Sequence, residues 1–347
     1  MRSSKSQVRS RTETGLKFES LEEKVDRTME FNWKRLSALA ILLVLLIVPP
    51  LAIDLGSNIM NVMVTLFIYI ILSQSWNLIG GYTGQVNLGI VAFFGISTMV
   101  THFLWKVGLP IFAAIPAGSL SAAILAALIG LPTLRLRGMY FAVGTLALAQ
   151  AAQVVVANIF VRQVAMPASF TTAYSLAPRY YLGLFLVVVA TAVVYFVTRS
   201  KVGLAMVAIR DDEQAAQVTG VKVFKYKVIA LLISAMLAGL AGGFYAYVRL
   251  SYWQISIVFS PLWTFDALLA VVIGGAGTLG GPIIGSIFLV VLSEIFANTL
   301  GQAHLIVFGF LFIMVVLFLP QGLMGGVDLV RAGMYRAWRS VRRPTIV

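Results

Sequence analysis

The sequence RSKVGLAMVAIRDDEQAAQVTGVKVFKYK, residues 199–227, is the only long polar passage between hydrophobic segments of this chain. It contains six Lys or Arg residues and three consecutive acids, Asp211, Asp212 and Glu213. Its middle, residues 203–219, has no proline and many good helix formers. Gly220 follows at a position typical of the first residue beyond a helix C-terminus. We therefore predict one polar helix over 203–219, joined at both ends to apolar segments.

The rest of the chain is dominated by apolar residues. Of its 347 residues, 60% are hydrophobic and only 11% are charged, whereas soluble domains have roughly 45–50% apolar and about 25% charged residues. Several apolar runs reach the roughly 20 residues that a membrane-spanning helix needs. The predicted fold class is an all-α polytopic membrane protein, and the polar helix would lie outside the membrane.

The charge and the reactive side chains exclude several classes of function. The formal net charge of +13 is typical of the cytoplasmic loops of a membrane protein, so we do not predict a nucleic-acid partner. The chain has no Cys, and its two His residues, His102 and His304, lie far apart. We therefore predict no disulfide, no metal site and no other cofactor.

The apolar runs divide into about ten predicted spans with a polar N-terminal tail, residues 1–35, and a basic C-terminal tail, 321–347. The transmembrane domain covers 36–320. The predicted spans are 36–53, 59–78, 89–105, 111–130, 139–160, 181–198, 228–248, 261–273, 282–296 and 304–319.

Lys and Arg residues are distributed unequally between the two sides of a ten-span chain. Twenty-two of the 26 fall in the two tails, the 131–138 connection and the 199–227 loop, which would all share one side. Because these residues concentrate in cytoplasmic loops, we predict that both termini and the polar helix lie in the cytoplasm.

Two glycine-rich passages interrupt the spans and share the sequence Ile-Gly-Gly, which is a weak internal repeat. They are GGYTGQVNLG, residues 80–89, and GGAGTLGGP, residues 274–282. Paired interruptions of this kind point to a transport pathway, since irregular backbone at membrane depth must be satisfied by protein or by water. The alternative is close helix packing, which alone would explain Gly239, Gly242 and Gly243. The candidate pathway or gate residues are Asn77, Gly80, Gly81, Thr83, Gly84, Gln85, Asn87, Gly274, Gly275, Gly277, Gly280 and Gly281.

Two acids, Asp266 and Glu294, fall within predicted spans. A buried acid in a membrane is costly and is therefore a functional candidate. Both are expected near the outer ends of their spans, where water is close. A role in substrate passage or partner docking and a purely structural role both stay open.

The chain lacks the motifs of an ATPase or a hydrolase. GGAGTLGG has no Lys-Ser/Thr pair to hold phosphates and Mg²⁺, and the chain contains neither HExxH nor GxSxG. It also lacks a series of intramembrane acids of the kind found in proton relays. We predict that this chain is not an enzyme.

Five motifs together resemble the permease subunits of branched-chain amino acid ABC importers, the LivM-like group. The first is SWNLIGGYTGQVNLG followed by AFFG, and the last is VVIGGAGTLGGP. The motifs occupy residues 75–89 with 92–95, 135–142, 203–220, 239–243 and 271–282. The resemblance extends over roughly residues 59–325.

This resemblance implies a subunit in the plasma (inner) membrane that moves branched-chain or other hydrophobic amino acids, or a related small solute such as urea or short amides, inward. It implies two cytoplasmic ATP-binding subunits, a second related permease subunit and an extracytoplasmic solute-binding protein. The 199–227 loop would hold the helix through which the ATPases act. The residues carried over to that role are Gly203, Arg210, Asp211, Asp212, Glu213, Ala216 and Gly220.

Two other classes of function stay open at this point. A stand-alone secondary transporter or channel for a small polar solute would need no ATPase partner. A structural or assembly subunit of a membrane complex would need the glycine-rich passages only for packing.

Overall fold

The computed structural model describes residues 57–136, 138–160, 175–249 and 254–300, with a few positions between 309 and 324. Apart from those few positions, the predicted spans 36–53 and 304–319 and both tails lie outside the described residues. Regular secondary structure in the described residues is entirely helical. The all-α prediction is therefore confirmed for this part of the chain.

The helices follow one another with short connections. They are α4 (Ser57–Trp76), η1 (Asn77–Tyr82), α5 (Ile90–Lys106), α6 (Ile111–Leu125), η2 (Ala126–Gly130), α7 (Leu131–Thr133), α8 (Met139–Phe160), α10 (Leu176–Arg199), α11 (Lys201–Asp211), α12 (Glu213–Val218), α13 (Val223–Val248), α14 (Ile255–Val258), α15 (Leu262–Gly274) and α16 (Gly281–Leu300). The elements η1 and η2 are π-helical continuations of α4 and α6.

Within the described residues, six helical stretches are long and apolar enough to cross a membrane. They are Asn58–Tyr82, Ile111–Thr133, Met139–Asn158, Leu176–Arg199, Val223–Val248 and Ile255–Gly274. Ile90–Lys106 and Gly281–Phe296 are shorter apolar helices. A multi-pass membrane protein is therefore supported, and the count of ten spans stays a prediction.

Most predicted span boundaries are close to those observed, and the errors have one direction. The 139–160 prediction matches α8 at both ends, but α10 begins at Leu176 and α13 at Val223, each about five residues early. Charged residues near a helix end misled the prediction. Arg179 was counted in an outer loop, yet it is buried in the first turns of α10, where its Nε donates to the Tyr247 carbonyl at 3.0 Å.

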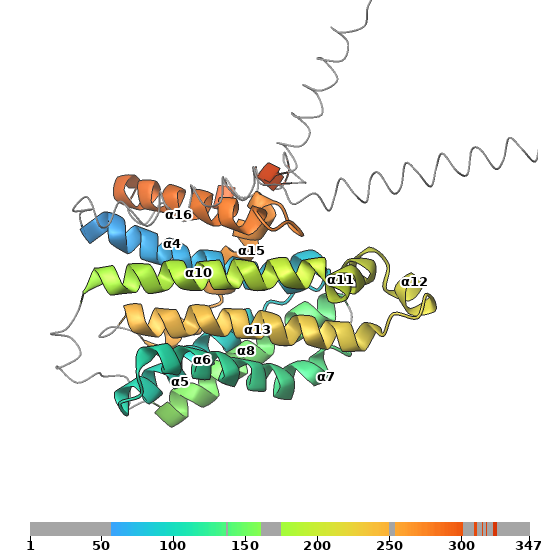
Figure 1. Ribbon diagram of the computed structural model, residues 1–347, viewed down its shortest axis with the longest axis horizontal. Helices are drawn as coiled ribbons and strands as arrows, with labels where there is room; N and C mark the ends of the chain where they lie inside the picture. The colour runs from blue at the N-terminus through green and yellow to red at the C-terminus, as the bar shows by residue number, and fades with distance from the viewer. Residues whose placement is uncertain are drawn as a thin grey trace, which may run out of the picture. The chain divides into compact units, whose positions relative to one another are not determined.

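Helix α13 is the centre of the described bundle and packs against α4, α5 and α6. Figure 1 shows it between α10 on one side and α5 and α6 on the other. Small residues on α13 allow this approach, as predicted for its glycines. A Cβ on Gly242 would overlap the Phe94 carbonyl oxygen of α5. Side-chain hydroxyls use the same proximity, because Ser97 Oγ donates to the Gly239 carbonyl at 2.6 Å and Thr98 Oγ1 to the Gly242 carbonyl at 2.9 Å.

We predict that Gly242→Ala destabilises the bundle by about 1–3 kcal/mol, because the added methyl group meets backbone that cannot move aside cheaply. Gly144→Ala is the matched control. Its Cβ would meet only the end of the Leu136 side chain, so the better helix propensity of Ala should leave stability unchanged or slightly raised. Thermal unfolding in detergent, followed by tryptophan fluorescence, measures both. Equal melting temperatures for the two variants would contradict the close-packing argument.

Candidate functional site

The first glycine-rich passage begins where α4 changes into the π-helical segment η1. Such segments are frequent at functional sites. Asn77, the first residue of η1, is fully buried. Beyond η1 the chain leaves helical structure until α5 starts at Ile90, and Gly84 has a positive φ of 74°. The Gln85 amide donates to the Ile79 carbonyl at 3.0 Å, which folds this turn back onto η1.

The second passage is a tight turn between α15 and α16. Gly275 and Gly277 have φ values of 118° and 73°, which favour glycine. Thr278 Oγ1 donates to the Gly275 carbonyl at 2.8 Å and accepts from the Gly281 amide at 3.0 Å. The turn is therefore held by its own polar groups, and its remaining backbone groups need partners from elsewhere.

Asn77 supplies those partners and so joins the two passages. Its Nδ2 donates to the Thr278 carbonyl at 2.8 Å, and its Oδ1 accepts from the Gly277 amide at 2.8 Å. One turn earlier on α4, Gln74 Nε2 donates to the Leu279 carbonyl at 2.9 Å. A Cβ on Gly81 would lie 2.6 Å from the Gly277 nitrogen. We call residues 77–84 and 274–281, which these contacts bring together, the glycine junction.

Arg210, near the end of α11, contacts both halves of the glycine junction. Its Nη1 donates to the Gly81 carbonyl at 3.1 Å. A Cβ on Gly277 would lie 2.6 Å from the same Nη1, and a Cβ on Gly84 would lie 2.9 Å from Arg210 Cγ. Three segments that are far apart in the sequence therefore meet at one guanidinium group. Arg210 Nη2 also lies 3.3 Å from Asp211 Oδ1, at the surface.

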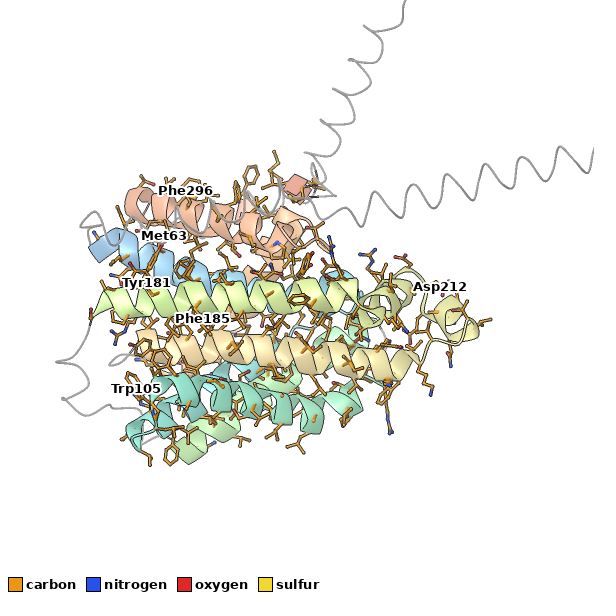
Figure 2. The ribbon with its side chains drawn as sticks, in the orientation of Figure 1. Met63, Trp105, Tyr181, Phe185, Asp212 and Phe296 are labelled. Atoms are coloured by element: carbon orange, nitrogen blue, oxygen red, sulfur yellow. The ribbon has the colours of Figure 1, made fainter. Side chains whose placement is uncertain are left out.

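The predicted single helix over 203–219 is wrong, because the structure has two helices that meet at Asp212. This residue has an extended backbone, with φ −158° and ψ 113°. Its Oδ1 accepts from the amides of Gln214 and Ala215 at 2.8 and 3.0 Å, so it caps the N-terminus of α12. Figure 2 shows Asp212 at the opposite end of the bundle from Trp105 and Tyr181. The prediction for Gly220 is confirmed, since it follows α12 with a φ of 90°.

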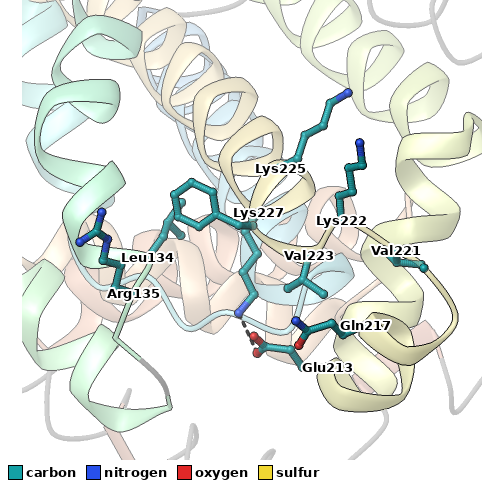
Figure 3. Close-up of a pocket in the computed structure, with 11 residues that line it drawn as sticks. Leu134, Arg135, Glu213, Gln217, Val221, Lys222, Val223, Lys225 and Lys227 are labelled. Carbon is teal, nitrogen blue, oxygen red and sulfur yellow. Dashed lines mark hydrogen bonds and ion pairs between the residues drawn. The ribbon is translucent and has the colours of Figure 1, made fainter.

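An ion pair ties α12 to the start of α13. Lys227 Nζ lies 2.7 Å from Glu213 Oε2, and Lys227 is only 5% exposed (Figure 3). We call α11 and α12 together the lever. It is held in three ways: by this ion pair, by Arg210 on the glycine junction, and by the buried Ala216. Gly203 lets the first turn of α11 approach the end of α10 around Thr198.

The other candidate pathway residues lie in and around the same turn, with local partners. Thr83 Oγ1 donates to the Leu78 carbonyl at 3.1 Å, and Asn87 Oδ1 accepts from the Gly89 amide at 2.8 Å. Gly80 lies against the Trp76 ring. Gln85 Oε1 and Asn87 Nδ2 are buried and have no hydrogen-bond partner among the described residues. A Cβ on Gly280 would meet only Met324, so close packing does not explain that glycine.

The two intramembrane acids are not part of the glycine junction. Asp266 Oδ2 accepts from the Tyr69 hydroxyl at 3.1 Å, across α15 and α4. An aromatic cluster surrounds this contact, with Trp263 5.3 Å from Tyr69 and 5.0 Å from Phe94 between ring centroids. Glu294 is exposed on α16. Asp266 thus has a hydrogen-bonded setting that favours the structural interpretation without excluding a functional one.

Sequence reasoning missed two residues that hold this site, Gln74 and Lys227. Gln74 had a detectable signal, because it lies three residues before Asn77 in an otherwise apolar run and so shares its helix face. Lys227 had none. Its partner Glu213 is 14 residues away, and no local pattern links the two positions.

A bundle of apolar helices, broken by two glycine-rich passages that meet a polar helix pair, defines a helical membrane transport protein. The chain belongs to the family described as branched-chain amino acid transport system / permease component, whose model matches residues 58–316. This confirms the family that the five motifs indicated.

Individual relatives agree with this assignment. The chain is 28% identical to the high-affinity branched-chain amino acid transport system permease protein LivM of Escherichia coli (strain K12), over 82% of this chain and 74% of the relative. It is 27% identical to LivM of Salmonella typhimurium, over 82% and 73%. A shorter match, 35% identical over 23% of this chain and 21% of the relative, is the putative glucose ABC transporter permease protein TsgC13 of Haloferax volcanii. No solved structure matches the chain significantly.

We predict that Asn77→Leu loosens the second passage, because the Thr278 carbonyl and the Gly277 amide lose their partner. Each unsatisfied buried group costs about 1–3 kcal/mol. Hydrogen–deuterium exchange of peptides covering 274–281 should become faster, while peptides from α8 stay unchanged as an internal reference. Asn77→Asp is the control and should have a smaller effect, since it keeps the acceptor for Gly277. Unchanged exchange in the Leu variant would show that Asn77 does not hold this turn.

Proposed function

We propose that this chain is the transmembrane permease subunit of an ABC importer and that partner ATPases drive it through the lever. The observation that carries the proposal is the contact of Arg210 with the glycine junction. A force applied to α11 and α12 from outside the membrane reaches the Gly81 carbonyl through one hydrogen bond. From Gly81 it reaches both interrupted helices, because Asn77 joins them.

The energetic scale of these contacts is consistent with a switch. A charge-assisted hydrogen bond contributes roughly 1.5–3 kcal/mol, and shifting an equilibrium from 1:99 to 99:1 takes about 5.5 kcal/mol. Arg210 alone would not suffice. Arg210 together with the buried Glu213–Lys227 pair brings two anchored points of the lever into that range, so we infer that both move with it.

The partners and the solute follow from the family. We infer two cytoplasmic ATP-binding subunits, a second related permease subunit and an extracytoplasmic solute-binding protein, with the lever and both termini on the cytoplasmic side. Relatives that cover most of the chain are named for branched-chain amino acids, so branched-chain or other hydrophobic amino acids are the first substrate candidates. The shorter match is named for glucose, and related small solutes such as urea and short amides stay candidates.

The glycine junction would then act as the gate. Its backbone groups are satisfied by Asn77, Gln74 and Arg210, so breaking these bonds would expose carbonyls and amides to a watery pathway. The unpartnered Gln85 Oε1 and Asn87 Nδ2 would add polar groups beside it. A strong binding site in this chain is unnecessary if a separate protein delivers the solute.

We predict that Arg210→Gln lowers solute uptake by the assembled importer by about tenfold or more, because the charged link to Gly81 is lost. ATP hydrolysis should continue, since the ATPases themselves are intact. Lys201→Gln removes a charge from the exposed first turn of the same helix and should transport like the parent protein. Wild-type uptake by the Arg210 variant, in complexes of normal composition, would refute this role of the lever.

A reconstitution experiment separates the importer from a stand-alone secondary transporter or channel. We expect liposomes that contain the purified chain alone to show no uptake under a proton or sodium gradient. Uptake should appear only with the second permease, the ATP-binding subunits, the solute-binding protein and ATP. Gradient-driven uptake by the chain alone would establish the alternative.

A further inference from the structure

A pocket of about 620 Å³ lies between α12, the start of α13 and the turn that follows α7 (Figure 3). Four basic residues line it, namely Arg135, Lys222, Lys225 and Lys227, with Glu213 as its acid. Because Glu213 is paired with Lys227 at 2.7 Å, the other three cations are left without compensation. Among the described residues, none of these three has an ion-pair partner.

The three cations stand at the mouth of the pocket, where they are accessible. Arg135, Lys222 and Lys225 are all exposed, whereas Lys227 is buried at the base. Figure 3 shows Arg135 on one side of the pocket and Lys222 and Lys225 on another, with the Glu213–Lys227 pair between them and deeper. The arrangement suits an anion that is bound from two sides, such as a phosphate group.

Apolar side chains begin directly beside these cations and face outward. Phe224 is 49% exposed and is the second residue of α13. Met139 and Tyr140, which open α8, are each 79% exposed. Both helices are candidate membrane spans. The mouth of the pocket therefore lies where the two helices enter the bilayer, with cations at the level of lipid headgroups and apolar side chains at the level of the acyl chains.

We propose that this pocket binds the phosphate-bearing headgroup of an anionic phospholipid. Basic pockets between spanning helices at the membrane surface favour such headgroups electrostatically. The exposed Phe224, Met139 and Tyr140 distinguish a lipid from an acidic segment of a soluble protein, which would leave these side chains without apolar cover. The bound headgroup would rest against Gln217 and Glu213 of the lever, so occupancy would also restrain α12.

The test measures lipid bound to the full-length chain in its assembled complex. The complex is placed in nanodiscs of phosphatidylcholine with increasing fractions of phosphatidylglycerol, and the retained lipid is identified by native mass spectrometry. The triple variant R135Q/K222Q/K225Q should lose most of its preference for phosphatidylglycerol, by about fivefold for each cation removed. Lys201→Gln removes one exposed charge at the same end of the bundle, outside the pocket, and should keep the preference.

Each outcome decides the proposal. Selective retention of phosphatidylglycerol by the parent protein and its loss in the triple variant would support it, provided that the two have the same melting temperature. Equal retention in both would overturn it. Competition by millimolar inorganic phosphate in phosphatidylcholine-only nanodiscs would assign the site to a soluble anion. If the triple variant keeps the lipid preference but releases its ATP-binding subunits, the pocket is a protein interface.

This binding measurement needs no ATP turnover, so its result is independent of the proposed importer function. A failed Arg210 experiment would leave the lipid site standing. A failed lipid experiment would likewise leave the coupling proposal unaffected.

Discussion

The described structure depends on one constraint, which is that backbone groups inside a membrane must find partners within the protein. Two helices are interrupted here, and each interruption exposes amides and carbonyls that lipid cannot satisfy. The carboxamide of Asn77 resolves this for both at once, since it donates to the Thr278 carbonyl and accepts from the Gly277 amide. A single side chain thereby makes two broken helices into one structural unit.

The polar helices outside the bundle are connected to this unit by charge. Arg210 ends on the Gly81 carbonyl, and Glu213 ends on Lys227 at the start of the central helix α13. Both contacts use ionised groups, which form the stronger hydrogen bonds. The break at Asp212 lies between them, so α11 and α12 each have an anchor of their own. The lever is therefore jointed, a property that a single continuous helix would not have.

The same region of the molecule combines two demands that the amino-acid chemistry keeps apart. Glu213 neutralises the one lysine that is buried, and the exposed Arg135, Lys222 and Lys225 remain available at the surface. Small residues on α13 satisfy a different demand, because they let α5 and α6 approach closely enough for hydroxyl groups to reach backbone carbonyls. Polar groups inside the bundle are thus used mainly to join helices.

The sequence by itself determined the membrane class, the family, the approximate helix positions, and the end of α12 at Gly220. These follow from local properties: apolar run length, motif identity and the need of one residue for a positive φ. It also selected the residues of the glycine junction, but not their partners. Only the tertiary structure decided that Asn77 joins the two passages, that Arg210 reaches Gly81, and that Lys227 pairs with Glu213. It also decided that Asp212 divides the polar helix, where cap and helix interior compete with similar energies. The physical reason is that partners separated by many residues leave no period or spacing in the sequence, and only packing brings them together.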